Sequence, residues 1–326
     1  MRNTLLLPAL LASISQLALS TPLFSPSLGN RQQPQQAGLN FTDYLYVYFT
    51  GERLPQGEQV YAAVSSNNSP KSWTTLNQGQ PILTSSLGTG GIRDPSLIIS
   101  PDRSKFYMIA TDLKVYGLGW NNGTCYTCNG SKSIIVWESS DLVSWTGPFS
   151  RRVSPPEAGM TWAPDAIWDF EREKYMAYWT SKIDGNLVIF RAFTEDFVSF
   201  TPAEKYVTYG MDATIVYDED TKRYYWISKN GPDELIQQRV STTGVNGPWT
   251  LVSERIGLGE MPAGEGPLIF RDNLDRGKWH LWIDDYMRGD GGYLPFETTD
   301  LAKGEWALSK DVKLPKNARH GYVVPM

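Results

Sequence analysis

The chain carries an internal repeat whose last copy is divided between its two ends. Each full copy begins with a short apolar strand led by a polar residue, here called the lead strand, and continues with an aromatic strand and a third strand ending in a turn. Residues 319–324 supply only a lead strand, whereas residues 44–65 supply only the later strands. Four-stranded repeats of roughly 40–60 residues are typical of β-propellers. The pattern therefore predicts an all-β, five-bladed β-propeller, closed by pairing the N-terminal strands with the C-terminal strand.

The alternative fold is a β-sandwich with similar strands. A sandwich does not predict complementary half-copies at the two termini, so the propeller is favoured. The four complete copies have lead strands that start near Arg93, Trp162, Met211 and Glu265.

Three segments follow from composition. Residues 1–20 are typical of a signal peptide, with Arg2 before a short apolar run and small residues at its end. Residues 21–39 are rich in Pro, Gln and Ser and are predicted to be a disordered leader. Residues 40–326 are predicted to form a single propeller domain. We expect a secreted, extracellular monomer without a membrane partner, because no apolar run is long enough to span a bilayer.

The charge balance argues against nucleic acid as a partner, because 35 acidic residues face 30 basic ones and no basic block occurs. Aromatic residues make up 13% of the chain, including 12 Trp. Both a large all-β core and a sugar-binding cleft use many aromatic residues, so composition does not separate the two. No cofactor is required by any motif.

The two cysteines, Cys125 and Cys128, are predicted to form a short local disulfide, as suits an oxidising compartment. A redox pair is disfavoured because no thioredoxin-like pattern surrounds them. Four glycosylation sequons, which would mark surface loops, start at Asn40, Asn67, Asn122 and Asn129.

In a propeller the lead strands line the central channel. Aligning them on their aliphatic residues predicts that one position in each blade faces a common cavity, with three carboxylates among the five residues. Carboxylates gathered in a cavity suit glycoside hydrolysis, in which one acid protonates the leaving oxygen and a second carboxylate acts on water or carbon. Crowding raises the pKa of one of them. The aligned residues are Asp94, Ala163, Asp212, Glu265 and His320.

These motifs resemble glycoside hydrolase family 43, the arabinanase, arabinofuranosidase and β-xylosidase group, over essentially the whole mature chain. The resemblance implies an inverting mechanism with Asp94 as general base, Glu265 as general acid and Asp212 as the group that modulates the pKa of the acid. The Asp-Pro motif at 94–95 follows about fifty residues of the mature fold, later than in many members. The matching motifs are Arg93-Asp94-Pro95, Trp162-Ala163-Pro164-Asp165, Asp212, Glu265-Gly266-Pro267 and Arg319-His320-Gly321.

Further residues are candidates for binding. Trp162 is expected to stack on a sugar ring, and Arg288 to reach a substrate hydroxyl or Asp212. His320 is expected to lie near a channel water or a structural Ca²⁺ held mostly through water, because one His cannot make a zinc site. Asp165 falls out of alignment and is predicted to be structural.

The resemblance implies hydrolysis of arabinose- or xylose-type linkages in plant cell-wall polysaccharide. The favoured activity is that of an α-L-arabinofuranosidase or arabinanase. A β-xylosidase or a galactan- or galactofuranose-acting hydrolase is the close alternative. A non-catalytic sugar-binding propeller is disfavoured because each blade contributes a different group to one centre. A fructan- or sucrose-acting relative should carry an acidic motif in its first blade, and none is clear here.

Overall fold

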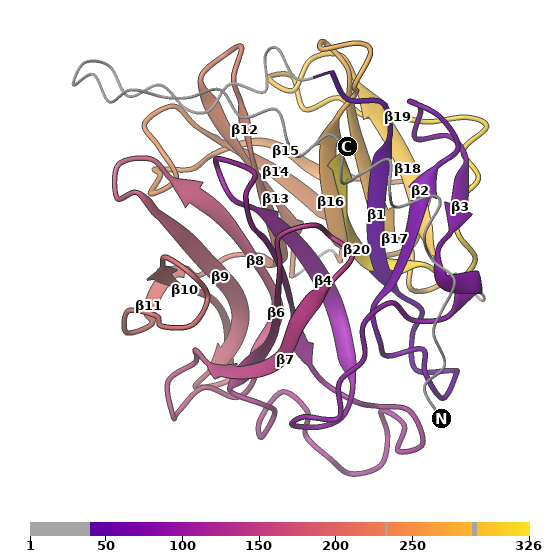
Figure 1. The fold of residues 1–326 in the computed structure, drawn as a ribbon. Coiled ribbons are helices and arrows are strands. Elements are labelled where there is room, and N and C mark those ends of the chain that lie inside the picture. Colours follow the sequence, from indigo (N-terminus) through magenta and orange to yellow (C-terminus); the bar gives the residue numbers. More distant parts are fainter. Residues whose placement is uncertain (1–39, 232–233, 289–291) are drawn as a thin grey trace.

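The computed structural model describes residues 40–231, 234–288 and 292–326, which form five four-stranded antiparallel sheets (Figure 1). The sheets follow one another around a ring, with adjacent lead strands in contact. The prediction of an all-β five-bladed propeller is therefore confirmed. The predicted signal peptide and leader lie outside the described residues.

The five blades are named A to E. Blade A contains β4 (Ile92–Ile99), β5 (Phe106–Asp112), β6 (Ser133–Ser139) and β7 (Trp145–Arg152). Blade B contains β8 (Trp162–Asp169), β9 (Lys174–Ile183), β10 (Asn186–Thr194) and β11 (Glu204–Val207). Blade C contains β12 (Met211–Asp218), β13 (Arg223–Lys229), β14 (Ile236–Ser241) and β15 (Thr250–Ile256). Blade D contains β16 (Glu265–Arg271), β17 (Trp279–Asp284), β18 (Tyr293–Thr298) and β19 (Ala307–Leu308). Blade E contains β20 (Arg319–Pro325), β1 (Tyr44–Phe49), β2 (Tyr61–Ser65) and β3 (Trp73–Thr75), and a short 3₁₀ helix, η1 (Asn77–Gly79), follows it.

Blade E closes the ring as the split repeat predicts. Its lead strand β20 comes from the C-terminal end and pairs antiparallel with β1, so that Leu45 lies opposite Val324 and Val47 opposite Tyr322 (Figure 1). This pairing completes the fifth sheet, so that each lead strand of the described ring pairs with the second strand of its blade.

The hydrophobic core is a ring of five clusters, and each cluster lies between two adjacent blades. One cluster, for example, packs Met108 of blade A against Val47 of blade E. No blade can therefore bury its apolar faces without its neighbours. Aromatic residues fill this core, including the fully buried Trp137, Trp179, Trp226 and Trp282.

All five lead strands contain the same irregularity near their start. In β4, Arg93 lies opposite Thr111 but Ser96 lies opposite Ile109, so three steps along the lead strand match two along its neighbour. This is a β-bulge, which adds one residue and redirects the side chains around it. The same offset occurs in β8, β12, β16 and β20.

The bulge corrects the predicted alignment of the blades. Glu265 begins the bulge of β16 just as Arg93 begins that of β4, so Glu265 corresponds to Arg93 rather than to Asp94. The equivalence predicted for Glu265 is wrong by one residue. The first bulge position holds Arg93, Trp162, Met211, Glu265 and Arg319, and the second holds Asp94, Ala163, Asp212, Gly266 and His320.

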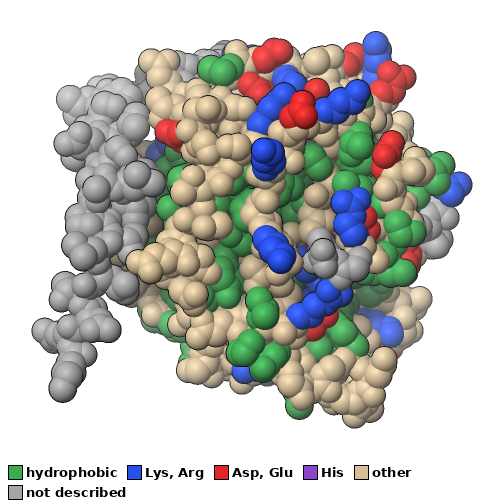
Figure 2. All heavy atoms as spheres, turned by 90° about the vertical axis from the view of Figure 1, so that its right-hand side faces the viewer, with side chains coloured by type: hydrophobic (Ala, Val, Ile, Leu, Met, Phe, Trp, Pro, Cys, Tyr) green, Lys and Arg blue, Asp and Glu red, His purple; other side chains and the backbone are tan. Residues whose placement is uncertain are grey.

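On the face drawn in Figure 2, the side of the molecule at the right of Figure 1, acidic and basic side chains occur together with scattered apolar ones. This face carries charge of both signs. Among the described residues, no helix is long and apolar enough to cross a membrane.

Closure of the ring can be tested at Gly321. A Cβ atom at this position would lie 2.0 Å from the carbonyl oxygen of Val47, a backbone atom of the paired strand. We expect Gly321→Ala to lower the free energy of unfolding by about 2–4 kcal/mol, because the β1–β20 pairing must shift. Gly231→Ala, where a Cβ would meet nothing within 4 Å, is the control. Equal chemical-denaturation midpoints for the two variants would contradict the prediction.

Candidate active site

Asp94 and His320 form an ion pair at the second bulge position of adjacent blades. His320 Nδ1 lies 3.2 Å from Asp94 Oδ1, and the Thr111 hydroxyl donates to Asp94 Oδ2 at 2.7 Å. Burial by itself would raise the pKa of Asp94, but the charge of His320 and these hydrogen bonds lower it to about 2. Burial would likewise lower the pKa of His320, but Asp94 raises it to about 9. Asp94 is therefore ionised and His320 protonated at neutral pH.

The glycine at the second bulge position of blade D makes room for His320. A Cβ at Gly266 would lie 2.4 Å from His320 Cγ, and the backbone there has φ 49°. The close contact with His320 requires glycine at this position, and the left-handed backbone favours it. Asp94 and Asp212 adopt φ 51° at the same position, although non-glycine residues are rarely found in this region. Such backbone strain is concentrated at functional sites.

Asp212 occupies the second bulge position of blade C and is buried there. Its backbone N–H donates to the Thr180 hydroxyl at 3.1 Å. Burial is the main cause that raises its pKa to about 6; the charge of His320 opposes this, and the negative charges of Glu265 and Asp94 add to it. Asp212 is thus the carboxyl group of this ring that retains a proton in mildly acidic solution.

Glu265 is held by two cations that the sequence analysis missed. Arg319 Nη2 donates to its Oε1 at 2.7 Å, and Lys229 Nζ lies 3.7 Å from its Oε2. Arg319 also donates to Asp284 Oδ2 at 3.0 Å. Asp284 is fully buried; burial raises its pKa to about 6, against the opposing charge of Arg319. The structure therefore brings Asp94, Asp212, Glu265 and His320 together, and adds Lys229, Asp284 and Arg319.

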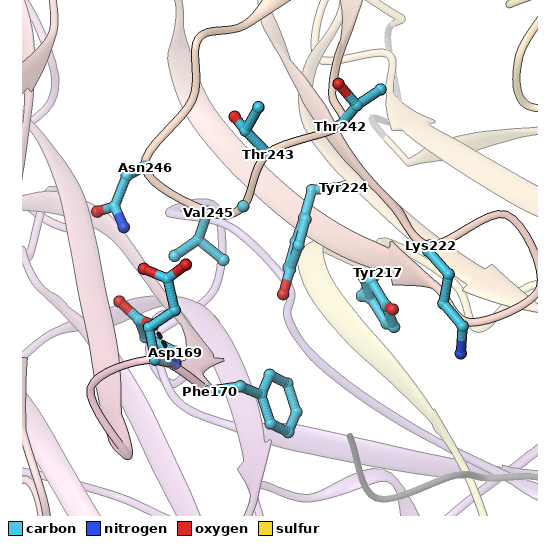
Figure 3. A pocket seen from close by; sticks show the side chains of 11 residues that line it. Asp169, Phe170, Tyr217, Lys222, Tyr224, Thr242, Thr243, Val245 and Asn246 are labelled. Atoms are coloured by element: carbon cyan, nitrogen blue, oxygen red, sulfur yellow. Dashed lines mark hydrogen bonds between the residues drawn. The ribbon is translucent and has the colours of Figure 1, made fainter. Parts of the chain in front are cut away.

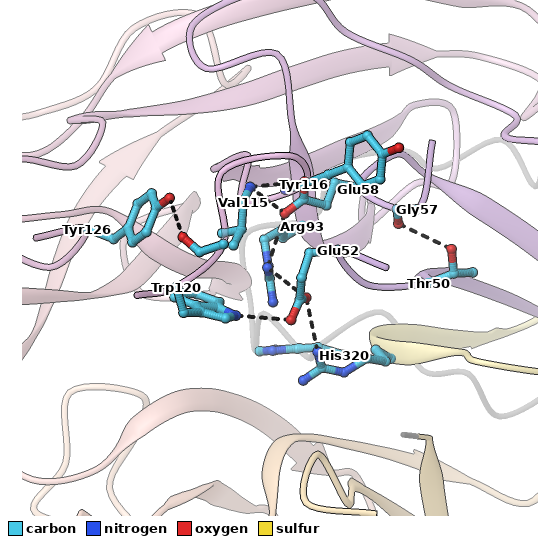
Figure 4. A network of polar contacts seen from close by, with 12 residues as sticks. Thr50, Glu52, Gly57, Glu58, Arg93, Val115, Tyr116, Trp120, Tyr126 and His320 are labelled. Atoms are coloured by element: carbon cyan, nitrogen blue, oxygen red, sulfur yellow. Dashed lines mark hydrogen bonds and ion pairs between the residues drawn. The ribbon is translucent and has the colours of Figure 1, made fainter. Parts of the chain in front are cut away.

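A second polar network lies beside Asp94 (Figure 4). The buried guanidinium of Arg93 pairs with Glu58 at 3.2 Å and Glu52 at 3.3 Å. Glu52 also lies 3.6 Å from Arg319 and accepts from the indole N–H of Trp120 at 3.0 Å. Glu52 therefore links blade A to the residues that hold Glu265.

The remaining residues singled out from the sequence differ in where they lie relative to the bulges. Trp162 begins the bulge of β8, partly exposed, with its ring 6.3 Å from that of Trp120. Arg288 donates to Asp285 at 3.1 Å, and no contact of it with Asp212 is observed among the described residues. Asp165 accepts from the hydroxyls of Ser96, Tyr178 and Thr214, which join three blades, so its structural role agrees with the geometry.

The described residues do not fit a directly bound metal ion. They contain no group of three or more His, Cys, Asp or Glu side chains arranged to hold one. His320 Nδ1 is engaged by Asp94, and a protonated imidazole does not ligate a metal. A water-mediated Ca²⁺ in the channel stays a prediction.

A pocket of about 190 Å³ lies elsewhere, against the outer turns of blades B and C (Figure 3). It is lined by Asp169, Tyr217 and Tyr224, among others, and by none of the predicted site residues. Asp169 accepts from Arg172 and from backbone N–H groups, so it stabilises a turn. Asp94, Asp212 and Glu265 lie at the bulges and do not line this pocket.

With this geometry in view, known proteins can be compared. Residues 40–326 match the family related to glycoside hydrolase family 43, described as "Probable glycosyl hydrolase domain". The chain belongs to this family. A curated relative, an α-L-arabinofuranosidase of Bifidobacterium longum subsp. longum, is 34% identical over 184 residues, covering 49% of this chain and 17% of that protein. The chain thus spans about a sixth of the length of this relative.

Solved structures share the fold of this family 43-related protein. An endo-1,4-β-xylanase of Bacteroides thetaiotaomicron has a TM-score of 0.54 at 17% identity, covering 83% of this chain and 95% of that one. A family 43 β-1,3-galactosidase has a TM-score of 0.54 at 15% identity, covering 78% and 87%. At these identities the likeness shows the fold alone.

The ion pair of the family 43-related site can be measured directly, because the chain has only two histidines. We expect NMR titration to give His320 a pKa of about 9. In Asp94→Asn the value should fall toward the ordinary 6.5, because the negative charge that stabilises the imidazolium is removed. The His280 resonance, from a residue paired with Asp272, serves as the internal control. An unchanged His320 titration in the variant would refute the pairing.

Proposed function

We propose that this protein is an inverting glycoside hydrolase of arabinose- or xylose-type linkages in plant cell-wall polysaccharide, and in particular an α-L-arabinofuranosidase or arabinanase. This proposal rests on one observation: two carboxyl groups at the bulges, those of Asp94 and Asp212, differ in their protonation states. Asp94 is held ionised by His320, while Asp212 beside it has its pKa raised to about 6. Hydrolysis of a glycosidic bond needs one carboxylate and one carboxylic acid at the same centre.

Asp94 acts as the general base. Its carboxylate takes a proton from water as that water attacks the anomeric carbon. A pKa of about 2 keeps it ionised over the working range, and the hydrogen bond from Thr111 fixes its orientation. His320 stays protonated and therefore keeps the negative charge on Asp94.

Glu265 acts as the general acid and protonates the departing oxygen. Arg319 donates to its Oε1 at 2.7 Å, and its Oε2, 3.7 Å from Lys229 Nζ, is the oxygen proposed to deliver the proton. Asp212 modulates this acid, because the charges of Asp212 and Glu265 act on each other.

The substrate proposal rests on the curated relative, an α-L-arabinofuranosidase. A β-xylosidase or a galactan-acting hydrolase is the alternative on the same fold. Hydrolysis of p-nitrophenyl furanosides and pyranosides, together with linear arabinan, xylan and galactan, tests it. Release of arabinose with inversion, followed by ¹H NMR, is the expected result. Binding of these polymers without hydrolysis of any would favour a non-catalytic sugar-binding propeller.

We also propose that the protein is secreted and acts as a monomer. The structure joins Cys125 and Cys128 in a disulfide, which suits an oxidising compartment. The asparagines of all four sequons are exposed, as glycosylation requires. Mass spectrometry of protein purified from culture medium would reveal the glycans and the mature N-terminus, and recovery only from the cell interior would refute secretion.

Substitution of the two carboxylates should separate their roles. We expect Glu265→Gln to lower kcat on an unactivated oligosaccharide by about 10²–10⁴-fold, but to lower it far less on an aryl glycoside whose leaving group needs no proton. Asp94→Asn should lower kcat on both substrates, because water still has to be activated. Exposed Glu305→Gln is the control. Near-normal turnover of the oligosaccharide by Glu265→Gln would refute the assignment.

The pH dependence of kcat/KM follows from the same groups. Burial raises the pKa of Asp212, the group proposed to modulate the acid, to about 6, so activity that requires its proton should be lost as the pH rises through this value. The base must be ionised, so the acid limb should lie near pH 2, below the range of ordinary assays. The profile should therefore be flat in mild acid and fall toward neutral pH. A maximum above pH 8 would contradict it.

A further inference from the structure

Trp120 is a large aromatic side chain left exposed beside the site. It lies on the loop between β5 and β6, and 42% of its surface is accessible. Its indole meets Trp162 edge-to-face at 6.3 Å and Tyr126 at 5.4 Å. Trp162 directly precedes the second bulge position of blade B. Trp120 thus contacts an aromatic residue at the first bulge position of blade B.

The ring of Trp120 is fixed rather than loosely exposed. Its N–H donates to Glu52 at 3.0 Å, and the Arg93 guanidinium lies 5.1 Å from its ring centroid. Arg93 is the residue next to Asp94 in the chain. These contacts therefore fix the indole against the residue that precedes the proposed base, Asp94.

The loop that carries Trp120 is braced at several points. Cys125 and Cys128 are joined in a disulfide, and the Gly130 N–H donates to the Gly159 carbonyl at 2.7 Å. The Tyr126 hydroxyl donates to the Gly119 carbonyl at 3.0 Å. Ordering an exposed loop costs conformational entropy. A ligand that binds a pre-ordered aromatic surface avoids that cost at the moment of binding.

We propose that Trp120 and Trp162 form an aromatic wall that binds a second sugar ring of an oligosaccharide whose neighbouring ring lies at Asp94. The apolar C–H face of a sugar packs on an indole, while the polar edge of Trp120 stays bonded to Glu52. Glu52 is a positioning residue, because it holds the indole and also pairs with Arg93 and Arg319. The inference rests on the proposed function and specifies that the site recognises chains of sugars rather than single glycosides.

The test measures binding without turnover. In an Asp94→Asn background, calorimetry with linear arabinotetraose, xylotetraose and β-1,3-galactotetraose gives Kd for the parent and for Trp120→Ala. We expect the ligand that binds the parent to bind Trp120→Ala about ten-fold more weakly or worse. Trp120→Phe, which keeps an aromatic face, should restore most of the affinity. Leu118→Ala, on the same loop and 61% exposed, is the matched control and should equal the parent.

A kinetic experiment distinguishes a sugar-binding role of Trp120 from a purely structural one. In the otherwise unaltered enzyme, Trp120→Ala should lower kcat/KM on the oligosaccharide but change it little on an aryl monosaccharide. Equal affinity of Trp120→Ala and its parent, an equal loss in Leu118→Ala, or no binding of any tetrasaccharide to the parent would overturn the inference. Hydrolysis that survives in Asp94→Asn would instead refute the catalytic assignment and leave the binding result standing.

Discussion

The bulge shared by the five lead strands determines how the centre of this protein is built. One extra residue in each lead strand turns two consecutive side chains out of the regular alternation of a strand. The second of these lies beside its counterparts in adjacent blades, as the contact of His320 with Asp94 and its packing against Gly266 show. In each blade one of these two residues also contacts the second strand of the preceding blade.

That second strand follows a rule that repeats around the ring. In each blade the residue opposite the first bulge position reaches the bulge of the next blade. The Thr111 hydroxyl accepts from the Ala163 N–H, Lys229 approaches Glu265, and Asp284 binds Arg319. The same position is filled by Thr180, which bonds the Asp212 N–H, and by Phe49, whose ring lies under Arg93. The chemical variety of the site thus comes from one backbone plan with five different pairs of residues.

The charges at this centre are nearly balanced, and burial determines which carboxyl groups have raised pKa values. The carboxylates of Asp94, Asp212, Glu265 and Asp284 face the cations His320, Arg319 and Lys229, four against three. Raised pKa values fall on Asp212 and Asp284, the two most buried carboxyl groups, because burial penalises charge there most. Asp94 has its own counter-ion and stays ionised.

Much of this arrangement follows from the sequence, because the repeat and its split copy predict both the ring and the strands that line it. The residue-level alignment fails at blade D: aliphatic spacing alone does not reveal a bulge, and it equates Glu265 with Asp94. The Pro that follows Asp94, Ala163 and Gly266 carries the correct alignment. Extending that alignment to the ends of the second strands would have found Lys229. Glu52 lies in the loop between β1 and β2, outside the repeated strands, so only the folded structure shows its role.

Blade E makes closure of the ring and assembly of the site a single event. Its lead strand supplies Arg319 and His320, and the loop after β1 supplies Glu52 and Glu58. Glu58 accepts the N–H groups of Val115 and Tyr116, where the loop of Trp120 begins. The C-terminal strand must therefore meet blade A before Asp94 has its counter-ion. The strained bulges are tolerable because five inter-blade clusters hold them in place, so the stability that closes the ring also keeps the proposed acid and base in position.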